Sequence, residues 1–283
     1  MATLKDIRRR IRSVASTEQI TKAMQMVAAS KLRRSQDRIL SARPYADTMT
    51  QILKSVAGAA AEFSHPLFEV RPVRRRTLVV IASDKGLCGS YNANLFRQAE
   101  QELGGWDQGQ VDLIPLGRRA SRYFGKRGWQ GSYGIVELGD QVSLFKSQDL
   151  ARHLVGLYAR GETDRVDLLY TRFLSVGSRR IVNETILPIA PEAEAADGMR
   201  KNYIFEPTAQ AIFGRLLPRY VQTRVMTATA ESLASEHASR LVSMSAATKN
   251  AGDMITALTL VRNKLRQAAI TKEISELVGA ARE

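Results

Sequence analysis

The residues best suited to chemistry lie in a short turn, Ser83 to Gly89, which follows a run of β-branched residues. Asp84 and Lys85 could act as an acid–base pair, and Cys88 could act as a nucleophile if a base lay beside it. No histidine belongs to the same motif, and a small cysteine next to glycine is more often a packing residue. A solvated turn at a strand end is therefore the favoured interpretation of this segment.

The sequence contains no motif typical of a phosphate-binding or metal-binding site. The turn contains Gly86 and Gly89, but neither it nor any other segment matches G-x-G-x-x-G or G-x-x-x-x-G-K-[ST]. The three histidines, His65, His153 and His237, lie in different segments without the spacing of metal ligands. We therefore expect no catalytic residues, no metal and no cofactor in this chain.

A small α/β domain is expected to hold this turn. The continuous, largely β-branched run from Thr77 to Ala82 is typical of a buried parallel strand. Further strands are expected at 111–116, 165–174 and 180–187, the last two joined as a hairpin, and helices at 92–103, 118–126 and 147–160. Strands that alternate with helices predict a Rossmann-like open sheet with an antiparallel edge, although the pattern leaves the strand order open.

The two ends of the chain read differently from the middle. The first proline is Pro44 and the last is Pro218, and no aromatic residue lies before Tyr45 or after Tyr220. Segments so poor in helix breakers predict long helices. We expect an N-terminal helix within 1–66, a globular domain at 70–205, and a C-terminal helix within 208–283 that has Pro218 in or near its first turn.

Both terminal segments carry apolar stripes at helical spacing. In the first, Thr3 and Asp6 predict a capping box, and the stripe begins at Leu4 and shifts to Ile20, Met24 and Val27. In the second, a heptad alternation occupies Leu241, Met244, Thr248, Ala251, Ile255, Leu258, Arg262 and Leu265, and the apolar residues Ile270, Ile274 and Leu277 extend it. The fold class is therefore α/β with long helices, in which the terminal helices form an antiparallel coiled coil. An ordinary helical bundle is the alternative.

Charge is concentrated at the two ends. The 283 residues hold 42 Lys+Arg against 28 Asp+Glu, a net charge of +14, of which residues 1–76 supply +10, residues 77–207 zero and residues 208–283 +4. Basic ends imply an acidic partner, which could be nucleic acid, an anionic membrane surface or acidic protein loops. A single cysteine excludes a disulfide framework and fits a reducing compartment. No apolar run is long enough to span a bilayer, and the basic start is not a secretory signal.

Three segments, in the right order, resemble the gamma-subunit family of the rotary F-type ATP synthase. They are the N-terminal motifs at 5–8 and 20–31, the turn at 83–89, and the C-terminal run at 266–281. The resemblance implies a rotor shaft that is not an enzyme by itself and that couples proton flow to ATP synthesis or hydrolysis. Its partners would be the hexameric ring of alpha and beta subunits, the epsilon subunit and the ring of c subunits.

The resemblance also implies where the protein works. The N-terminal motif begins too early to leave room for a transit peptide, which favours a bacterial form, and no cysteine pair of the regulatory chloroplast type is present. The protein would then lie at the cytoplasmic face of the plasma membrane, held there only through the complex.

Individual positions carry roles only through this resemblance. Met24 and Arg240 would face an acidic loop of the beta subunit, and if they lie level, residue 4 lies opposite about residue 260. Further contacts with a beta-subunit loop would be made by Arg266, Gln267 and Thr271. Ile270, Ile274 and Leu277 would belong to an apolar bearing, and the turn with Asp84, Lys85 and Cys88 would lie near beta and epsilon.

Two other classes of function stay open. A basic coiled-coil protein that binds nucleic acid would account for the arginine clusters at 8–10, 33–34 and 74–76, but the basic ends lack interleaved aromatic residues. An α/β enzyme with helical arms would need the phosphate loop or acid–base pair that the sequence lacks.

Overall fold

The computed structural model describes residues 3–60, 65–129, 131–134, 137–139, 144–189 and 208–280. The elements in chain order are α1 (Leu4–Ala60), the 3-10 helix η1 (Pro66–Phe68), β1 (Arg76–Ile81), α2 (Tyr91–Leu103), β2 (Val111–Leu116), α3 (Arg118–Gly125), α4 (Leu144–Ala159), β3 (Arg165–Phe173), β4 (Arg179–Leu187) and α5 (Ala209–Ala280). Residues 1–29 and 240–283 form one compact unit and residues 30–239 form another, so α1 and α5 contribute to both.

The two long terminal helices expected from the sequence are confirmed, with 57 residues in α1 and 72 in α5. The position of Pro218 is not the expected one, because α5 begins at Ala209 and Pro218 lies inside it. Phe213 and Leu217 explain the earlier start, since both are fully buried against the sheet and hold the preceding turns in place. None of the helices in the described part of the chain has the length and hydropathy needed to cross a bilayer.

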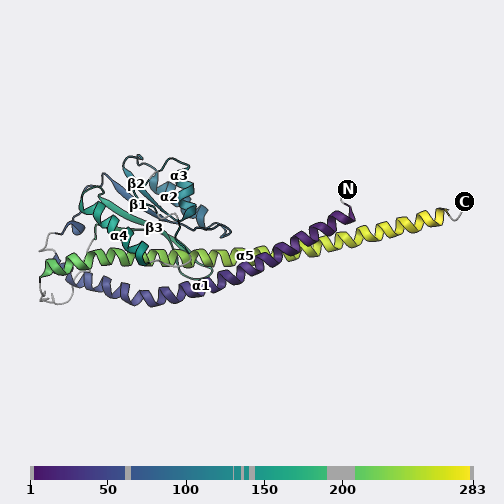
Figure 1. Cartoon of the computed structure of the whole chain (residues 1–283), viewed down its shortest axis with the longest axis horizontal. Coiled ribbons are helices and arrows are strands. Elements are labelled where there is room, and N and C mark those ends of the chain that lie inside the picture. The colour runs from purple at the N-terminus through teal and green to yellow at the C-terminus, as the bar shows by residue number, and fades with distance from the viewer. Residues whose placement is uncertain are drawn as a thin grey trace. The chain divides into compact units, whose positions relative to one another are not determined.

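The middle of the chain forms a four-stranded mixed sheet in the order β2-β1-β3-β4 (Figure 1). Strand β1 runs parallel to β2 and to β3, and β4 runs antiparallel to β3 at the edge. The expected strands, the hairpin and the open α/β class are confirmed. The order, which the sequence left open, places β1 between its two parallel neighbours.

Apolar side chains cover both faces of the sheet, which explains why all six residues of β1 are buried. Leu78 and Val80 point to the face covered by α2 and α3, and Val79 and Ile81 point to the face covered by α4 and α5. Leu53, near the end of α1, packs with the residues on the face covered by α4 and α5. The layered arrangement is the one expected for an open sheet that carries helices on both sides.

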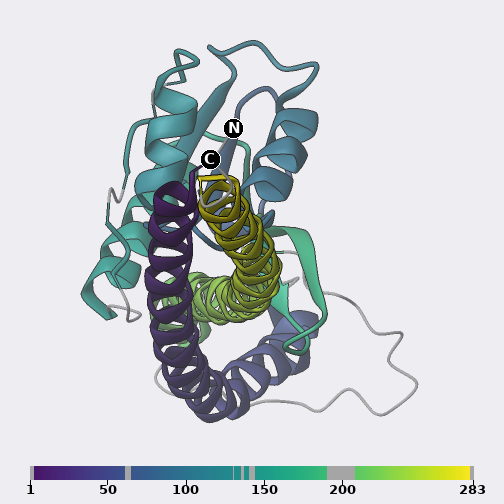
Figure 2. The ribbon, with the colours of Figure 1, turned by 90° about the vertical axis from the view of Figure 1, so that its right-hand side faces the viewer.

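In the other unit, α1 and α5 lie side by side and antiparallel (Figures 1 and 2). The Thr248 hydroxyl donates a hydrogen bond of 2.8 Å to the Thr21 hydroxyl, and Glu18, one turn earlier in α1, lies beside Gly252, one turn later in α5. This register places Met24 level with about residue 245. The expectation that Met24 lies level with Arg240 is therefore wrong by about five residues.

The buried stripe of α1 also departs from the expected one. The heptad spacing that begins at Leu4 continues without a shift through the positions of Glu18, Thr21 and Gln25 to Ala28. Ile20 and Val27, expected in the stripe, are 57% and 54% exposed. The reason is geometric, because a shift to residues 20 and 27 would turn the contact face by about 100° around the helix. Polar side chains therefore take the inward positions and aliphatic ones face outward.

The C-terminal heptad is confirmed. Each of its eight positions is buried or half-buried in the described structure, including the polar Thr248 and Arg262. Leu4, the first residue of α1, lies level with about residue 265, so α5 continues past the start of α1 (Figure 1).

Candidate functional site

Asp84, a candidate acid–base residue, organises loops. Its Oδ1 accepts hydrogen bonds from the backbone N–H groups of Arg118 (3.1 Å) and Leu138 (3.2 Å), and its Oδ2 accepts one from Gly139 (2.8 Å). A carboxylate that serves three amides in this way ties the end of β1 to the start of α3 and to the segment at 137–139. The contacts of Asp84 agree with the structural interpretation of the turn.

Cys88 is a packing residue in this structure. Its side chain is buried, its Sγ lies 3.3 Å from the Asn92 amide nitrogen, and its carbonyl oxygen accepts a 2.7 Å hydrogen bond from the Ser239 hydroxyl. Among residues 83 to 88, Lys85 and Leu87 are exposed, and the other four are buried or half-buried. Of the three turn residues singled out in the sequence, Lys85 is therefore the one with an exposed side chain.

The place where open α/β sheets bind ligands is filled by the chain itself. In such sheets, ligands bind at the carboxyl ends of the strands, where the connections diverge to opposite sides of the sheet. Here this point lies between β1 and β3. The Ser232 hydroxyl donates to the Ile81 carbonyl (3.1 Å), and the Ser235 hydroxyl donates to the Thr171 carbonyl (2.9 Å). Helix α5 thus occupies the crevice in which a nucleotide would lie.

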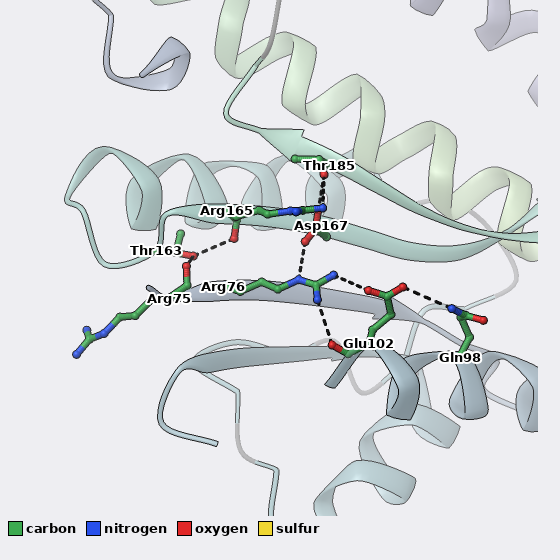
Figure 3. Close-up of polar contacts among 8 residues, drawn as sticks. All are labelled: Arg75, Arg76, Gln98, Glu102, Thr163, Arg165, Asp167 and Thr185. Atoms are coloured by element: carbon green, nitrogen blue, oxygen red, sulfur yellow. Dashed lines mark hydrogen bonds and ion pairs between the residues drawn. The ribbon is translucent and has the colours of Figure 1, made fainter. Parts of the chain in front are cut away.

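A buried polar network lies at the opposite, amino ends of the strands (Figure 3). The Arg76 guanidinium contacts the Asp167 carboxylate through Nε at 2.6 Å and the Glu102 carboxylate through Nη2 at 3.0 Å. Asp167 is fully buried and also accepts hydrogen bonds from Arg165 (2.9 Å) and Thr185 (2.6 Å). Every oxygen of this buried carboxylate is satisfied, so the cluster is a structural tie between β1, β3, β4 and α2.

This network changes the meaning of the arginine cluster at 74–76. Arg76 is only 6% exposed and is committed to Asp167 and Glu102, so it adds nothing to a basic surface. The backbone N–H groups of Arg74 and Arg75 both donate to the Asp164 carboxylate at 2.9 Å. Arg76 is therefore removed from the basic surface that favoured nucleic-acid binding, whereas the side chains of Arg74 and Arg75 are exposed. Local sequence patterns could not predict these contacts, because the partners of Arg76 lie 26 and 91 residues away.

The candidate shaft positions fall into two groups. Met24 is half-buried in α1 and Arg240 is buried in α5, so both are largely enclosed by the chain itself. Arg266, Gln267 and Thr271 are exposed on the part of α5 that continues past α1. Nothing in the described structure tests the roles that the resemblance gives to these residues.

Three apolar side chains on the same part of α5 face solvent. Ile270, Ile274 and Leu277 are 47%, 55% and 71% exposed. Apolar side chains at this spacing form a stripe on one side of a helix, and a stripe without a covering surface marks an interaction site. The described part of the last turns of α5 therefore carries an exposed apolar stripe.

Comparison with known proteins gives matches along the whole chain. The family described as ATP synthase matches residues 3–282. The ATP synthase gamma chain of Desulforamulus reducens is 43% identical over 281 residues, and that of Heliobacterium modesticaldum is 43% identical over 288 residues, each alignment covering 99% of both chains.

Two solved structures are similar in fold. One is the central stalk of the Tetrahymena thermophila mitochondrial ATP synthase, solved with its c-ring, with a TM-score of 0.63, 28% identity, and coverage of 81% of this chain and 99% of that one. The other is the rotor of the Euglena gracilis mitochondrial ATP synthase, with a TM-score of 0.70, 20% identity, and coverage of 94% and 98%.

Proposed function

Because this chain belongs to the family of ATP synthase gamma chains, we propose that it is the central rotor shaft of a rotary ATP synthase, coupling transmembrane proton flow to ATP synthesis or hydrolysis. The observation that carries the proposal is the antiparallel pair of α1 and α5, from which α5 continues alone with exposed Ile270, Ile274 and Leu277. A shaft needs such an asymmetric, continuous helix to act on a ring of subunits. In this proposal residues 1–66 and 208–283 form the shaft and residues 70–205 form the globular domain.

The chain itself carries no catalysis in this proposal. ATP would be made or hydrolysed in the hexamer of alpha and beta subunits, and the epsilon subunit and the c-subunit ring would be the other partners. The chain would be a peripheral protein at the cytoplasmic face of the plasma membrane, without contact with nucleic acid. The occupied crevice at the carboxyl ends of β1 and β3 supports the non-catalytic role, because α5 stands where a nucleotide would otherwise bind.

The exposed polar residues of the α5 extension suit a surface that turns inside a sleeve. Arg266, Gln267 and Thr271 would contact a loop of the beta subunit, while Ile270, Ile274 and Leu277 would form the bearing. Exposed pairs of charges are worth little in water, so a basic shaft can meet acidic loops in succession without becoming locked to one of them. Met24 and Arg240 would serve the same acidic loops, and the turn with Asp84, Lys85 and Cys88 would reach beta and epsilon through Lys85.

The decisive experiment is recovery of the tagged chain from native membranes at moderate salt, followed by mass analysis of what is bound. We expect alpha, beta and epsilon subunits in the recovered complex, and ATPase activity in the complex but not in the isolated chain. Recovery of nucleic acid without ATPase subunits would overturn the proposal in favour of the basic nucleic-acid binder.

A further inference from the structure

One face of α5 changes in character where it reaches the carboxyl edge of the sheet. Up to that edge the residues facing the sheet are apolar and buried in a single cluster: Phe213, Leu217, Val221, Val225 and Ala228. Beyond it the same face continues with Ser232, Ser235 and Ser239, at the spacing of three and four residues that keeps side chains on one side of a helix. All of these residues belong to the unit of residues 30–239.

Each of the three serines donates its hydroxyl to a backbone carbonyl of the α/β domain. Ser232 donates to Ile81 at the end of β1 and Ser235 to Thr171 near the end of β3, at 3.1 and 2.9 Å. Ser239 donates to the carbonyl of Cys88 in the following turn at 2.7 Å. The serine side chains are 2%, 0% and 6% exposed, so water cannot replace these bonds without opening the contact.

Three further contacts hold the same helix segment. The Ser232 hydroxyl also lies 2.9 Å from the phenol oxygen of Tyr91 at the start of α2. Arg224 and Glu231, seven residues apart on α5, form ion pairs with Glu184 of β4 and Arg172 of β3, the second at 3.4 Å. The segment of α5 from residue 224 to residue 239 is therefore fixed to β1, β3, β4 and α2.

These hydrogen bonds are directional, whereas the contacts of the apolar part of the same helix face are not. Apolar contacts have no preferred direction, so they specify the rotation and axial position of a helix less sharply than hydrogen bonds do. A hydroxyl–carbonyl bond weakens steeply when its angle or length changes. A slide of α5 by one residue, about 1.5 Å, or a small rotation about its axis would strain all three serine bonds together.

We propose that Ser232, Ser235 and Ser239 are positioning residues that fix the rotation and axial position of α5 on the α/β domain, so that torque applied to one is passed to the other. The proposal rests on the proposed function, because only a rotor has torque to transmit. The serines lie where the α/β domain, which would turn with the rotor, contacts the part of α5 that leads toward the ring of alpha and beta subunits. They touch no substrate and are not catalytic residues.

The test is the torsional stiffness of the assembled complex. The variant Ser232→Ala/Ser235→Ala/Ser239→Ala keeps helix propensity and removes only the three hydroxyl groups. With the alpha/beta ring anchored and a probe on the α/β domain, we expect torsional stiffness of about half the parent value, since the three hydroxyl–carbonyl bonds are lost and the ion pairs of Arg224 with Glu184 and of Glu231 with Arg172 remain. ATPase activity of the variant complex should stay within a factor of about two of the parent, because no group near the reacting atoms changes.

The matched control is Thr229→Val. Thr229 is also buried in α5, but its hydroxyl bonds to the Val225 carbonyl of its own helix, so its loss removes a buried hydroxyl without untying the domain. We expect parent stiffness from this control. Equal stiffness in the triple variant, the control and the parent would overturn the assignment.

Two further outcomes test the serine assignment and the rotor role separately. If the triple variant fails to assemble, Ser235→Ala alone is compared with Thr229→Val, and a fall in stiffness only in the former supports the proposal whereas equality overturns it. A parent chain that does not rebuild an active ATPase contradicts the proposed function itself. Failure of the serine assignment is therefore distinguishable from failure of the rotor role.

Discussion

The hydroxyl oxygens of Thr21 in α1 and Thr248 in α5 lie 2.8 Å apart, at heptad positions where a coiled coil usually holds two aliphatic side chains. Thr21 is 8% exposed, so the bond is shielded from water. A buried polar pair in this seam favours one register over its neighbours, because any slide separates the two hydroxyl groups. The pair belongs to the observed register, which differs by about five residues from the one that the resemblance suggested.

Replacing one member of this pair should destabilise the helix pair. Thr248→Val leaves the Thr21 hydroxyl facing a methyl group, with its own bond to the Glu18 carbonyl at 3.0 Å still in place. We expect a loss of about 1 kcal/mol in the free energy of unfolding, measured by urea denaturation followed by circular dichroism. The double variant Thr21→Val/Thr248→Val should recover most of it, because two apolar side chains then meet. A double variant less stable than the single one would contradict the role of the pair.

The buried carboxylate of Asp167 should be among the most sensitive positions of the α/β domain. Asp167→Ala leaves Arg76 buried with only part of its partners, and it leaves Arg165 and Thr185 with their mutual hydrogen bond of 2.9 Å but without the carboxylate. We expect a loss of about 3–5 kcal/mol, measured as a shift of the urea midpoint at constant slope. Glu162→Ala, which breaks the exposed pair with Arg160, is the control and should move the midpoint little. Similar shifts of the urea midpoint for both variants would show that burial of the Asp167 carboxylate does not determine the loss of stability.

The stability of the first turn of α1 should fall at acidic pH. The Thr3 hydroxyl and backbone N–H, together with the nearby Arg9 and Arg10, hold the pKa of Asp6 below its ordinary value of 3.8. The carboxylate therefore stabilises the folded turn at pH values above 3.8, and this contribution is lost as the pH falls through the lowered pKa. Thr3→Ala should raise the pKa of Asp6 toward 3.8, measured by NMR titration of the side-chain carboxyl carbon. An unchanged pKa would mean that the arginines, and not Thr3, set it.

Removal of residues 265–283 should separate the shaft role from folding. The deleted segment lies beyond the region where α1 covers α5, so the α/β domain should keep its fold and its protection in hydrogen exchange. Assembly of the ATPase, or the coupling of its ATP hydrolysis to proton pumping, should weaken, because the exposed stripe of Ile270, Ile274 and Leu277 is gone. A truncated chain that rebuilds a complex with parent assembly and coupling would show that these residues form no bearing.

A charge placed at Met24 should affect coupling more than catalysis. Met24→Lys adds a cation where the proposed function puts an acidic loop of the beta subunit, and a new ion pair would hold the shaft at one angle. ATP hydrolysis should continue, with fewer protons pumped per ATP than in the parent complex. The ratio is measured with a pH-sensitive dye in reconstituted vesicles. Equal ratios in variant and parent would contradict the placement of Met24.

Much of the architecture follows from local patterns. The lack of helix breakers at the two ends predicted α1 and α5, the β-branched runs predicted the four strands, and the heptad from Leu241 to Leu265 marked the inward face of α5. The Thr3–Asp6 capping box is present as predicted. These features depend on neighbouring residues within one or two turns, so the sequence determines them directly.

Contacts between distant residues could not be found in this way. Outward-facing Ile20 and Val27 look like core residues by type, and only the partner helix decides that Thr21 and Ala28 point inward. Arg76 looks like part of a basic surface until β3 and α2 place two carboxylates around it. The occupied crevice at the sheet edge needs serines that lie more than 60 residues along the chain from the carbonyls they bind. The residues of each segment determine its helical or strand periodicity. Register and buried polar pairing depend instead on which segments the fold brings together.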